Sequence, residues 1–83
     1  MKKKKILTIA DKPNEANMLK TLLEQADYMV ICAYDGEEGI KKAKLAKPDV
    51  IILDIVSSEK DWYRTADALR NDLDCCMIPT IVL

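Results

Sequence analysis

The sequence predicts a single α/β domain built on a parallel β-sheet. Two apolar stretches, residues 6–10 and 50–53, are rich in isoleucine and leucine, and each runs directly into an aspartate. Uninterrupted aliphatic strands of this kind are typical of a parallel sheet that helices cover on both faces. Segments with helical spacing alternate with the strands, and the resulting β-α-β-α-β-α-β order favours parallel strands joined by right-handed crossovers.

The first helix is predicted to begin at Pro13, because proline suits the first helical position. Residues 28–34 are rich in β-forming side chains and predict the second strand, in which Cys32 is expected as a small core residue. The apolar residues of the helix recur at helical spacing and predict an inner face made of Ala16, Leu19, Leu23 and Ala26, with Leu22 alongside.

Asp35 is predicted to cap a second helix, whose first turn contains Glu37 and Glu38 near the positive end of the helix dipole. This helix is expected to end before Pro48, because the residue that precedes a proline disfavours α geometry. The side chains predicted to face inward are Ile40, Ala43 and Ala46.

The third strand is predicted over residues 50–55, the third helix over residues 61–72 and a fourth strand over residues 78–83. Cys75 and Cys76 are expected as two reduced thiols in the loop before the fourth strand. Spacing predicts that the inner face of the third helix consists of Trp62, Ala66, Leu69 and Leu73.

Composition and charge restrict the class of partner. The chain has 83 residues, with fourteen acidic and thirteen basic side chains, and four of the basic ones lie in a lysine-rich tail over residues 1–5. The remaining body is acidic, which argues against direct nucleic acid binding by this segment. No stretch reaches membrane-spanning length or has the layout of a signal peptide, so we expect no membrane association and a cytoplasmic location.

The two strand-end aspartates, Asp11 and Asp54, are the candidate functional residues. The carboxyl ends of parallel strands line the crevice where open α/β sheets place their sites, and two carboxylates there favour a cation, a proton or phosphoryl chemistry. The chain has no histidine, so a zinc site and a Ser-His or Cys-His pair are disfavoured. The alternative interpretations are that Asp11 caps the first helix and that Asp54 is a strand-end residue facing solvent.

Four sequence motifs in a fixed order carry a family resemblance. They are KILTIADKP at residues 5–13, AYDGEEG at 33–39, KPDVIILDI at 47–55 and IPTIVL at 78–83, with Asp61 and the Leu69-Arg70 pair between the last two. This pattern resembles the receiver domain of response regulators, the phosphate-accepting module of two-component signalling. The resemblance implies a flavodoxin-like, three-layer fold with the parallel strand order 2-1-3-4-5.

The resemblance also implies the chemistry of the site. Asp54 would accept a phosphoryl group from a sensor histidine kinase or a phosphotransfer protein. Asp11, Asp54 and the backbone carbonyl of Val56 would hold Mg²⁺, a cation that prefers hard oxygen ligands and retains several waters. The cation would neutralise charge during phosphoryl transfer, which depends mainly on positioning and electrostatics.

The chain also departs from the family pattern. Ala10 stands where the family has a first acidic residue, and residues 57–59 and Trp62 replace a Met-Pro-Gly type turn and a later glycine. The 83 residues stop before the family's hydroxyl residue, its lysine-bearing fifth strand and its last two helices. We therefore expect a partial receiver with reduced phosphotransfer and an exposed sheet edge that favours homo-oligomers.

Two other functions are alternatives to that of a phosphoacceptor. A degenerate receiver could serve as an interaction or dimerisation module without phosphotransfer. A phosphohydrolase is disfavoured, because Asp54-Ile55-Val56 lacks the second carboxylate that haloacid-dehalogenase-type phosphatases use two residues after the nucleophile. The sequence therefore predicts that the protein is not an enzyme.

Overall fold

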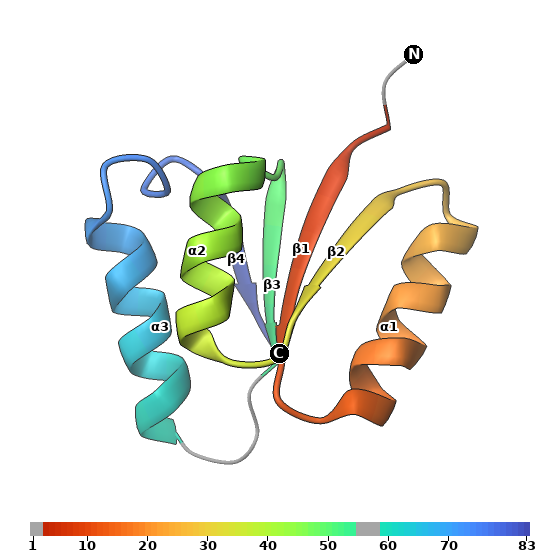
Figure 1. The fold of residues 1–83 in the computed structure, drawn as a ribbon, viewed down its shortest axis with the longest axis horizontal. Coiled ribbons are helices and arrows are strands. Elements are labelled where there is room, and N and C mark those ends of the chain that lie inside the picture. The colour runs from red at the N-terminus through yellow and green to blue at the C-terminus, as the bar shows by residue number, and fades with distance from the viewer. Residues whose placement is uncertain (1–2, 55–58) are drawn as a thin grey trace.

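The computed structural model describes residues 3–54 and 59–83, which form a three-layer structure with a four-stranded parallel sheet in the middle (Figure 1). The strand order β2-β1-β3-β4 agrees with the predicted flavodoxin-like topology. Helix α1 covers one face of the sheet, and α2 and α3 cover the other. The elements are β1 (Lys5–Ala10), α1 (Pro13–Gln25), β2 (Met29–Ala33), α2 (Gly36–Ala46), β3 (Val50–Asp54), α3 (Glu59–Asn71) and β4 (Thr80–Val82).

The main core lies between the sheet and the α2/α3 layer. The central strands β1 and β3 contribute alternate side chains to it, as the period of two in a strand requires. Each fully buried aliphatic side chain contributes roughly 1.5–3 kcal/mol relative to exposure. The cluster comprises Leu7, Ile9, Ala33, Ala43, Ile51, Leu53, Leu69 and Cys75.

The opposite face of the sheet packs against α1 through the fully buried Ala16, with Leu19 and Leu23 half-buried. The prediction was wrong for one residue of the inner face, Ala26. Leu22, expected alongside that face, is 58% exposed, because the stripe formed by residues 16, 19 and 23 leaves it on the flank of the helix. Ala26 is exposed because α1 ends at Gln25, where the chain turns through a left-handed residue.

Helix α2 follows the prediction. The Asp35 carboxylate accepts a hydrogen bond from the backbone N–H of Glu38 at 2.7 Å, which is the expected N-cap. The helix ends at Ala46, and Lys47 takes the left-handed conformation with φ 47°. Ala43 is buried, while Ile40 and Ala46 are half-buried.

Helix α3 begins at Glu59 rather than at residue 61 and ends at Asn71. Leu73 therefore lies beyond the helix and is 94% exposed, so its predicted place in the core was wrong. Thr65 is buried instead, facing α2 so closely that a Cβ at Gly36 would collide with its hydroxyl oxygen. Trp62 and Ala66 are half-buried against the core and Leu69 is buried, as predicted.

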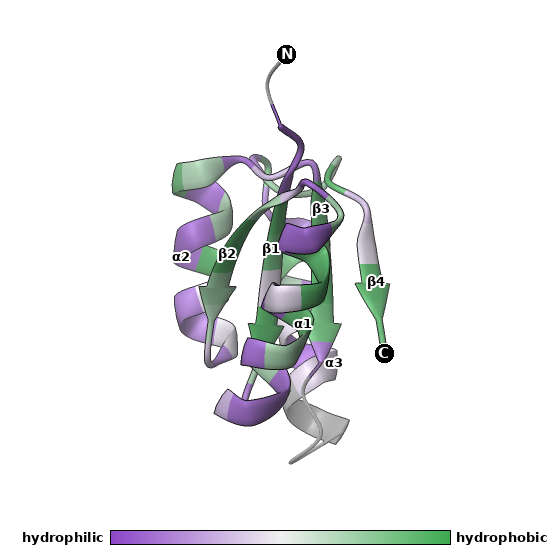
Figure 2. Cartoon of the chain, turned by 90° about the vertical axis from the view of Figure 1, so that its right-hand side faces the viewer, coloured by the Kyte–Doolittle hydropathy of each residue, from purple (hydrophilic) through white to green (hydrophobic). Residues whose placement is uncertain are grey.

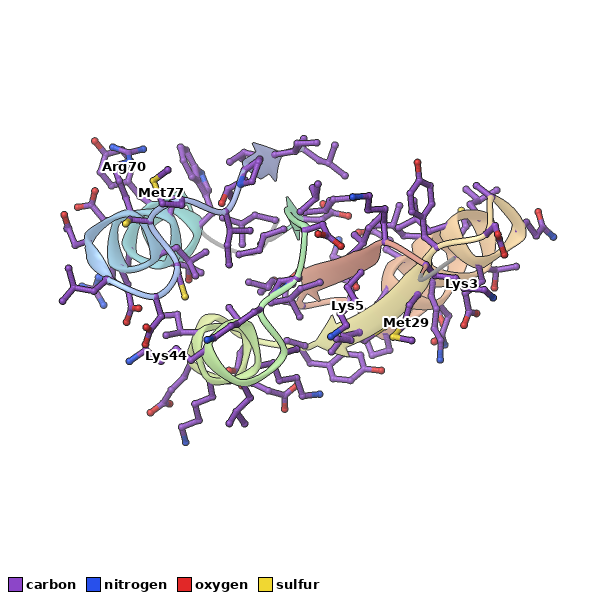
Figure 3. All side chains as sticks on the ribbon, turned by 90° about the horizontal axis from the view of Figure 1, so that it is seen from above. Lys3, Lys5, Met29, Lys44, Arg70 and Met77 are labelled. Carbon is purple, nitrogen blue, oxygen red and sulfur yellow. The ribbon has the colours of Figure 1, made fainter. Side chains whose placement is uncertain are left out.

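Several strands begin or end at residues other than those predicted. Strand β2 spans Met29–Ala33, and Cys32 within it is half-buried rather than a core residue. Strand β4 spans only Thr80–Val82. Lys5, assigned to the basic tail from the sequence, is the first residue of β1, where it pairs with Met29 of β2. Its N–H also donates to Asp49 Oδ2 at 2.8 Å. Figure 3 shows Lys5 beside its register partner Met29 at the amino ends of the two strands.

All three cysteines are free thiols, and Cys75 and Cys76 lie in the α3–β4 connection as predicted. Cys75 is buried, and this burial raises the pKa of its thiol, whereas Cys76 is exposed. No helix in the two described ranges combines the length and apolarity needed to cross a bilayer.

Candidate functional site

The candidate site lies at the carboxyl ends of the two central strands. Ala10 is the register partner of Asp54 across the parallel β1–β3 ladder, and Asp11 follows Ala10 directly. Neighbouring strands lie about 4.8 Å apart, so the two aspartates occupy adjacent strand ends. Both residues are half-buried. The predicted juxtaposition of Asp11 and Asp54 at one edge of the sheet is therefore present.

Two helices begin at this same edge. Helix α1 begins at Pro13, just after β1, and α2 begins at Gly36, just after β2. In a parallel sheet, each connecting helix starts near the carboxyl end of one strand and leads back to the amino end of the next. A helix N-terminus presents unpaired N–H groups and the positive end of the dipole. This environment favours negative charge, including that of carboxylates and of a phosphoryl group.

The alternative interpretations of the aspartates can be compared with the structure. The N-cap position of α1 belongs to Lys12, with an extended backbone and no side-chain cap, so Asp11 lies one residue before that position. Asp54 is the last residue of β3 and is only partly exposed. The structure therefore rejects the capping alternative for Asp11 and leaves the strand-end alternative for Asp54 open.

Side chains of α2 hold the neighbouring end of β2. Glu38 Oε1 accepts the N–H of Tyr34 at 3.1 Å, and Lys42 Nζ donates to the carbonyl of Cys32 at 2.6 Å. Lys42 also pairs with Glu38 at 3.5 Å. The sequence interpretation missed this network, although Glu38, three residues after the cap Asp35, is the capping-box pattern that could have indicated it. These contacts fix the turn that leads from β2 into α2.

The donor set at the site suits magnesium rather than zinc. Within residues 3–54 and 59–83, no three histidine, cysteine, aspartate or glutamate side chains gather in a group that could hold a metal ion. A cation would therefore depend on the carboxylates of Asp11 and Asp54, main-chain oxygens and water, which is the usual coordination of Mg²⁺. Val56, whose carbonyl was predicted as a third ligand, lies outside the described residues.

Comparison with known proteins decides the family. Residues 6–82 match the response regulator receiver domain family. The chain belongs to this family. Among curated relatives, the receiver domain is 39% identical over 80 residues to the alkaline phosphatase synthesis transcriptional regulatory protein PhoP of Bacillus subtilis, covering 96% of this chain and 32% of that protein.

Solved receiver structures resemble this receiver domain closely in fold. The chemotaxis protein CheY4 of Vibrio cholerae superposes with a TM-score of 0.88 at 28% identity, covering 98% of this chain and 68% of that one. The N-terminal domain of a response regulator receiver protein from Methanoculleus marisnigri gives 0.87 at 29% identity, covering 94% and 63%. The chain spans about a third of the length of PhoP. The flavodoxin-like receiver fold predicted from the sequence is confirmed.

Proposed function

We propose that this receiver domain accepts a phosphoryl group on Asp54 from a sensor histidine kinase or a phosphotransfer protein in the cytoplasm. The observation that supports this function is the β1–β3 register, which brings Asp54 next to the strand end that carries Asp11. The neighbouring N-termini of α1 and α2 favour the negative charge that such a transfer delivers.

In the proposed transfer, a carboxylate oxygen of Asp54 attacks the phosphorus of a phosphohistidine. The new O–P bond forms as the N–P bond breaks, and the histidine nitrogen departs with the electron pair. Asp11, Asp54 and the backbone carbonyl of Val56 would hold Mg²⁺, which when bound neutralises charge on the oxygens. The protein accepts and releases one group per cycle, so we do not assign it an enzymatic activity of its own.

Reduced competence is part of the proposal. Ala10 leaves the site without a second acidic side chain after β1, so Mg²⁺ binding should be weak.

A second candidate function is a degenerate receiver that binds partners or copies of itself without phosphotransfer. One observation favours it: Ala10 is buried in the position where the family resemblance places a carboxylate. This function would use the fold and its surfaces and leave Asp54 unmodified.

Phosphorylation by acetyl phosphate in the presence of MgCl₂, followed by intact mass and peptide mapping, tests the two functions. We expect slow labelling that Asp54→Asn abolishes. Asp67→Asn, which changes an exposed aspartate on α3, is the matched control and should label like the unaltered chain. Absence of label from acetyl phosphate and from a phosphorylated kinase, in a chain with native circular dichroism, would reject the phosphoacceptor function in favour of the interaction module.

A further inference from the structure

Strand β2 has a free edge on the side away from β1. Figure 2 shows β2 at one margin of the sheet, beside α2, with β4 at the other margin. The strand order 2-1-3-4-5 that the family resemblance implies also leaves the second strand at the margin. The edge of an outer strand presents backbone N–H and C=O groups that can pair with another chain.

The direction of each backbone group of β2 follows from its register with β1. The N–H of Met29 donates to the carbonyl of Lys4 at 2.9 Å. Since alternate residues of a parallel strand bond to the same neighbour, residues 29, 31 and 33 face β1. The residues whose N–H and C=O groups point away from the sheet are Val30, Cys32 and Tyr34.

Side chains of α2 close the carboxyl-terminal half of this edge. The carbonyl of Cys32 accepts a hydrogen bond from Lys42 Nζ at 2.6 Å, and the N–H of Tyr34 donates to Glu38 Oε1 at 3.1 Å. These two backbone groups are therefore not available to another strand.

The amino-terminal half of the edge is open. Among the described residues, nothing binds the N–H or the carbonyl of Val30, or the N–H of Cys32. The carbonyl of Tyr28 also points outward, because a trans peptide directs it opposite to the N–H of Met29. By contrast, the N–H of Tyr28 already donates to the carbonyl of Leu23 at 3.1 Å.

We infer that a second copy of this chain pairs with β2 in an antiparallel arrangement, about a two-fold axis at Val30. Val30 of each copy then exchanges both N–H···O=C bonds with Val30 of the other copy. Two residues along, Cys32 lies opposite Tyr28 of the second copy and donates its N–H to that carbonyl. The return bond is not needed, because the N–H of Tyr28 and the carbonyl of Cys32 already have partners within the chain.

The pattern of open and occupied groups is thus its own complement, which is why the partner is a second copy. Four hydrogen bonds across the axis satisfy all the open groups of both edges. The two-fold axis is perpendicular to the sheet, and the two four-stranded sheets join into one continuous sheet. Closed two-fold dimers of this kind are the commonest homo-oligomers.

The same register sets apolar side chains against one another. Met29, which is 48% exposed, lies opposite Ile31 of the second copy in a non-hydrogen-bonded pair, where side chains approach most closely. On the other face of the sheet, Val30 meets Val30 of the second copy. No like charges oppose each other along the strands, because residues 28–34 carry no charge.

An exposed leucine on α2 lies beside the proposed axis. Leu45 is 86% exposed, and it comes three residues after Lys42, so it shares the flank of α2 that reaches β2. Helix α2 runs opposite to β2, and three helical residues advance by roughly 4.5 Å, about the rise of one and a half strand residues. Since Lys42 lies level with Cys32, Leu45 lies close to the level of Val30. The axis brings the Leu45 side chains of the two copies toward each other on the same face of the joined sheet.

The charges at the two ends of β2 are compatible with this arrangement. Lys3 pairs with Asp27 at 3.3 Å before the strand, and Lys42 pairs with Glu38 at 3.5 Å beside its carboxyl end. Antiparallel pairing sets each of these ion pairs next to the other pair of the second copy. Cations and anions are then present on both sides of the interface, which favours association over repulsion.

Sedimentation equilibrium of single variants tests the pairing. Val30→Pro removes the outward N–H and leaves the bonds to β1 intact, because those use residues 29, 31 and 33. Two hydrogen bonds are lost per dimer, so the dissociation constant should rise about thirtyfold. Val30→Thr retains the N–H and the β-branched shape, and should associate like the unaltered chain.

A second variant tests the interface without changing the backbone. Leu45→Lys replaces an apolar contact at the axis with two cations, and should raise the dissociation constant at least about tenfold. Leu73→Lys makes the same change at a 94% exposed position beyond α3, and should leave association unchanged. If Val30→Pro does not fold, the comparison of these two surface variants decides.

Hydrogen exchange in the unaltered chain gives an independent readout. The amides of Val30 and Cys32 should become protected as the protein concentration rises into the range of dimer formation. The amide of Tyr34, which is bonded to Glu38 within the chain, should not change. A monomer at several hundred micromolar, a folded Val30→Pro or Leu45→Lys chain that associates normally, or a dimer whose Val30 and Cys32 amides exchange freely would each overturn the inference. It does not depend on phosphorylation of Asp54.

Discussion

Ala10 and Asp54 face each other across the β1–β3 ladder, at the last paired position of both strands. Ala10 is 1% exposed, whereas Asp54 is half-buried. A methyl group thus occupies the position beside the proposed phosphoacceptor where the family resemblance places a carboxylate. The consequence is a site with less negative charge and less repulsion between neighbouring side chains than a carboxylate at this position would give. Under the proposed function, this difference would weaken Mg²⁺ binding.

Ala10→Asp should make the stability of the chain depend on magnesium. Without the cation, a buried carboxylate beside Asp54 should cost at least about 2 kcal/mol. Saturating Mg²⁺ at a hundredfold excess over its dissociation constant should restore about 2.7 kcal/mol. Urea unfolding with and without MgCl₂ measures both effects. Ala43→Asp, at an equally buried alanine on α2, should destabilise the fold without any rescue by Mg²⁺.

Asp54→Asn and Asp11→Asn should each abolish divalent cation binding, because each removes one of the two carboxylates that the described residues place at these adjacent strand ends. Paramagnetic broadening of amide resonances by Mn²⁺ gives the measurement, with residues next to both strand ends expected to broaden first. Asp67→Asn serves as the surface control. Equal broadening in the two site variants and the control would show that the carboxylates do not bind the cation.

The sequence predicted what depends on local pattern and parallel topology. The cap at Asp35 and the placement of Asp11 and Asp54 at one edge of the sheet follow from these two features, whereas the strand order was implied by the family resemblance. Helix ends were harder to predict. Leu73 continues the apolar spacing of α3, yet the helix stops at Asn71, and Asp27 ends the α1 turn through a positive φ of 72° that no residue type there indicates.

The contacts between elements were also beyond sequence reasoning. The hydrogen bond from Lys42 to Cys32 depends on how α2 is rotated over β2, and the burial of Thr65 depends on how closely α3 approaches Gly36. Both are set by packing between segments that are distant in the sequence. The spacing of apolar residues specifies which side of a helix faces the sheet, but it does not specify which residues contact an adjacent helix or strand.

The ion pair between Lys44 and Asp72 should make stability fall in acid. Lys44 Nζ lies 2.9 Å from Asp72 Oδ2 and joins the last turn of α2 to the chain after α3, at the end of the sheet opposite the candidate site (Figure 3). The hydrogen bond from Lys44, followed by one from the N–H of Asp74, lowers the pKa of Asp72. A lowered pKa in the folded state gives stability that is present above the unfolded value and is lost as the pH falls through the folded value.

Asp72→Asn should therefore lower the urea midpoint at pH 7 and flatten the decline between pH 5 and pH 2. The hydrogen bond to Asp72 also raises the pKa of Lys44. The stabilisation of the folded state by this ion pair should therefore persist at alkaline pH until the pH rises through the raised pKa of Lys44. Lys44→Met should give the same flattening as Asp72→Asn, and the double variant should add little to either. Acid profiles that stay parallel in the variants and the unaltered chain would assign the acid sensitivity to other carboxylates.

Gly39→Ala should destabilise the fold even though alanine is the better helix former. A Cβ at Gly39 would collide with Cδ1 of Ile9 and would lie 2.7 Å from its Cγ1. Because Ile9 is fully buried in the main core, its side chain has little room to move away. Overpacking of this kind costs about 1–3 kcal/mol, against a gain of about 1 kcal/mol in helix propensity, so the net loss should reach up to about 2 kcal/mol. Ile9→Val removes Cδ1, the atom in the closest contact, and costs about 1 kcal/mol alone. If the contact is the cause, the double variant should be more stable than the sum of the two single losses predicts, as measured by urea unfolding. Strict additivity would show that the core accommodates the extra methyl group elsewhere.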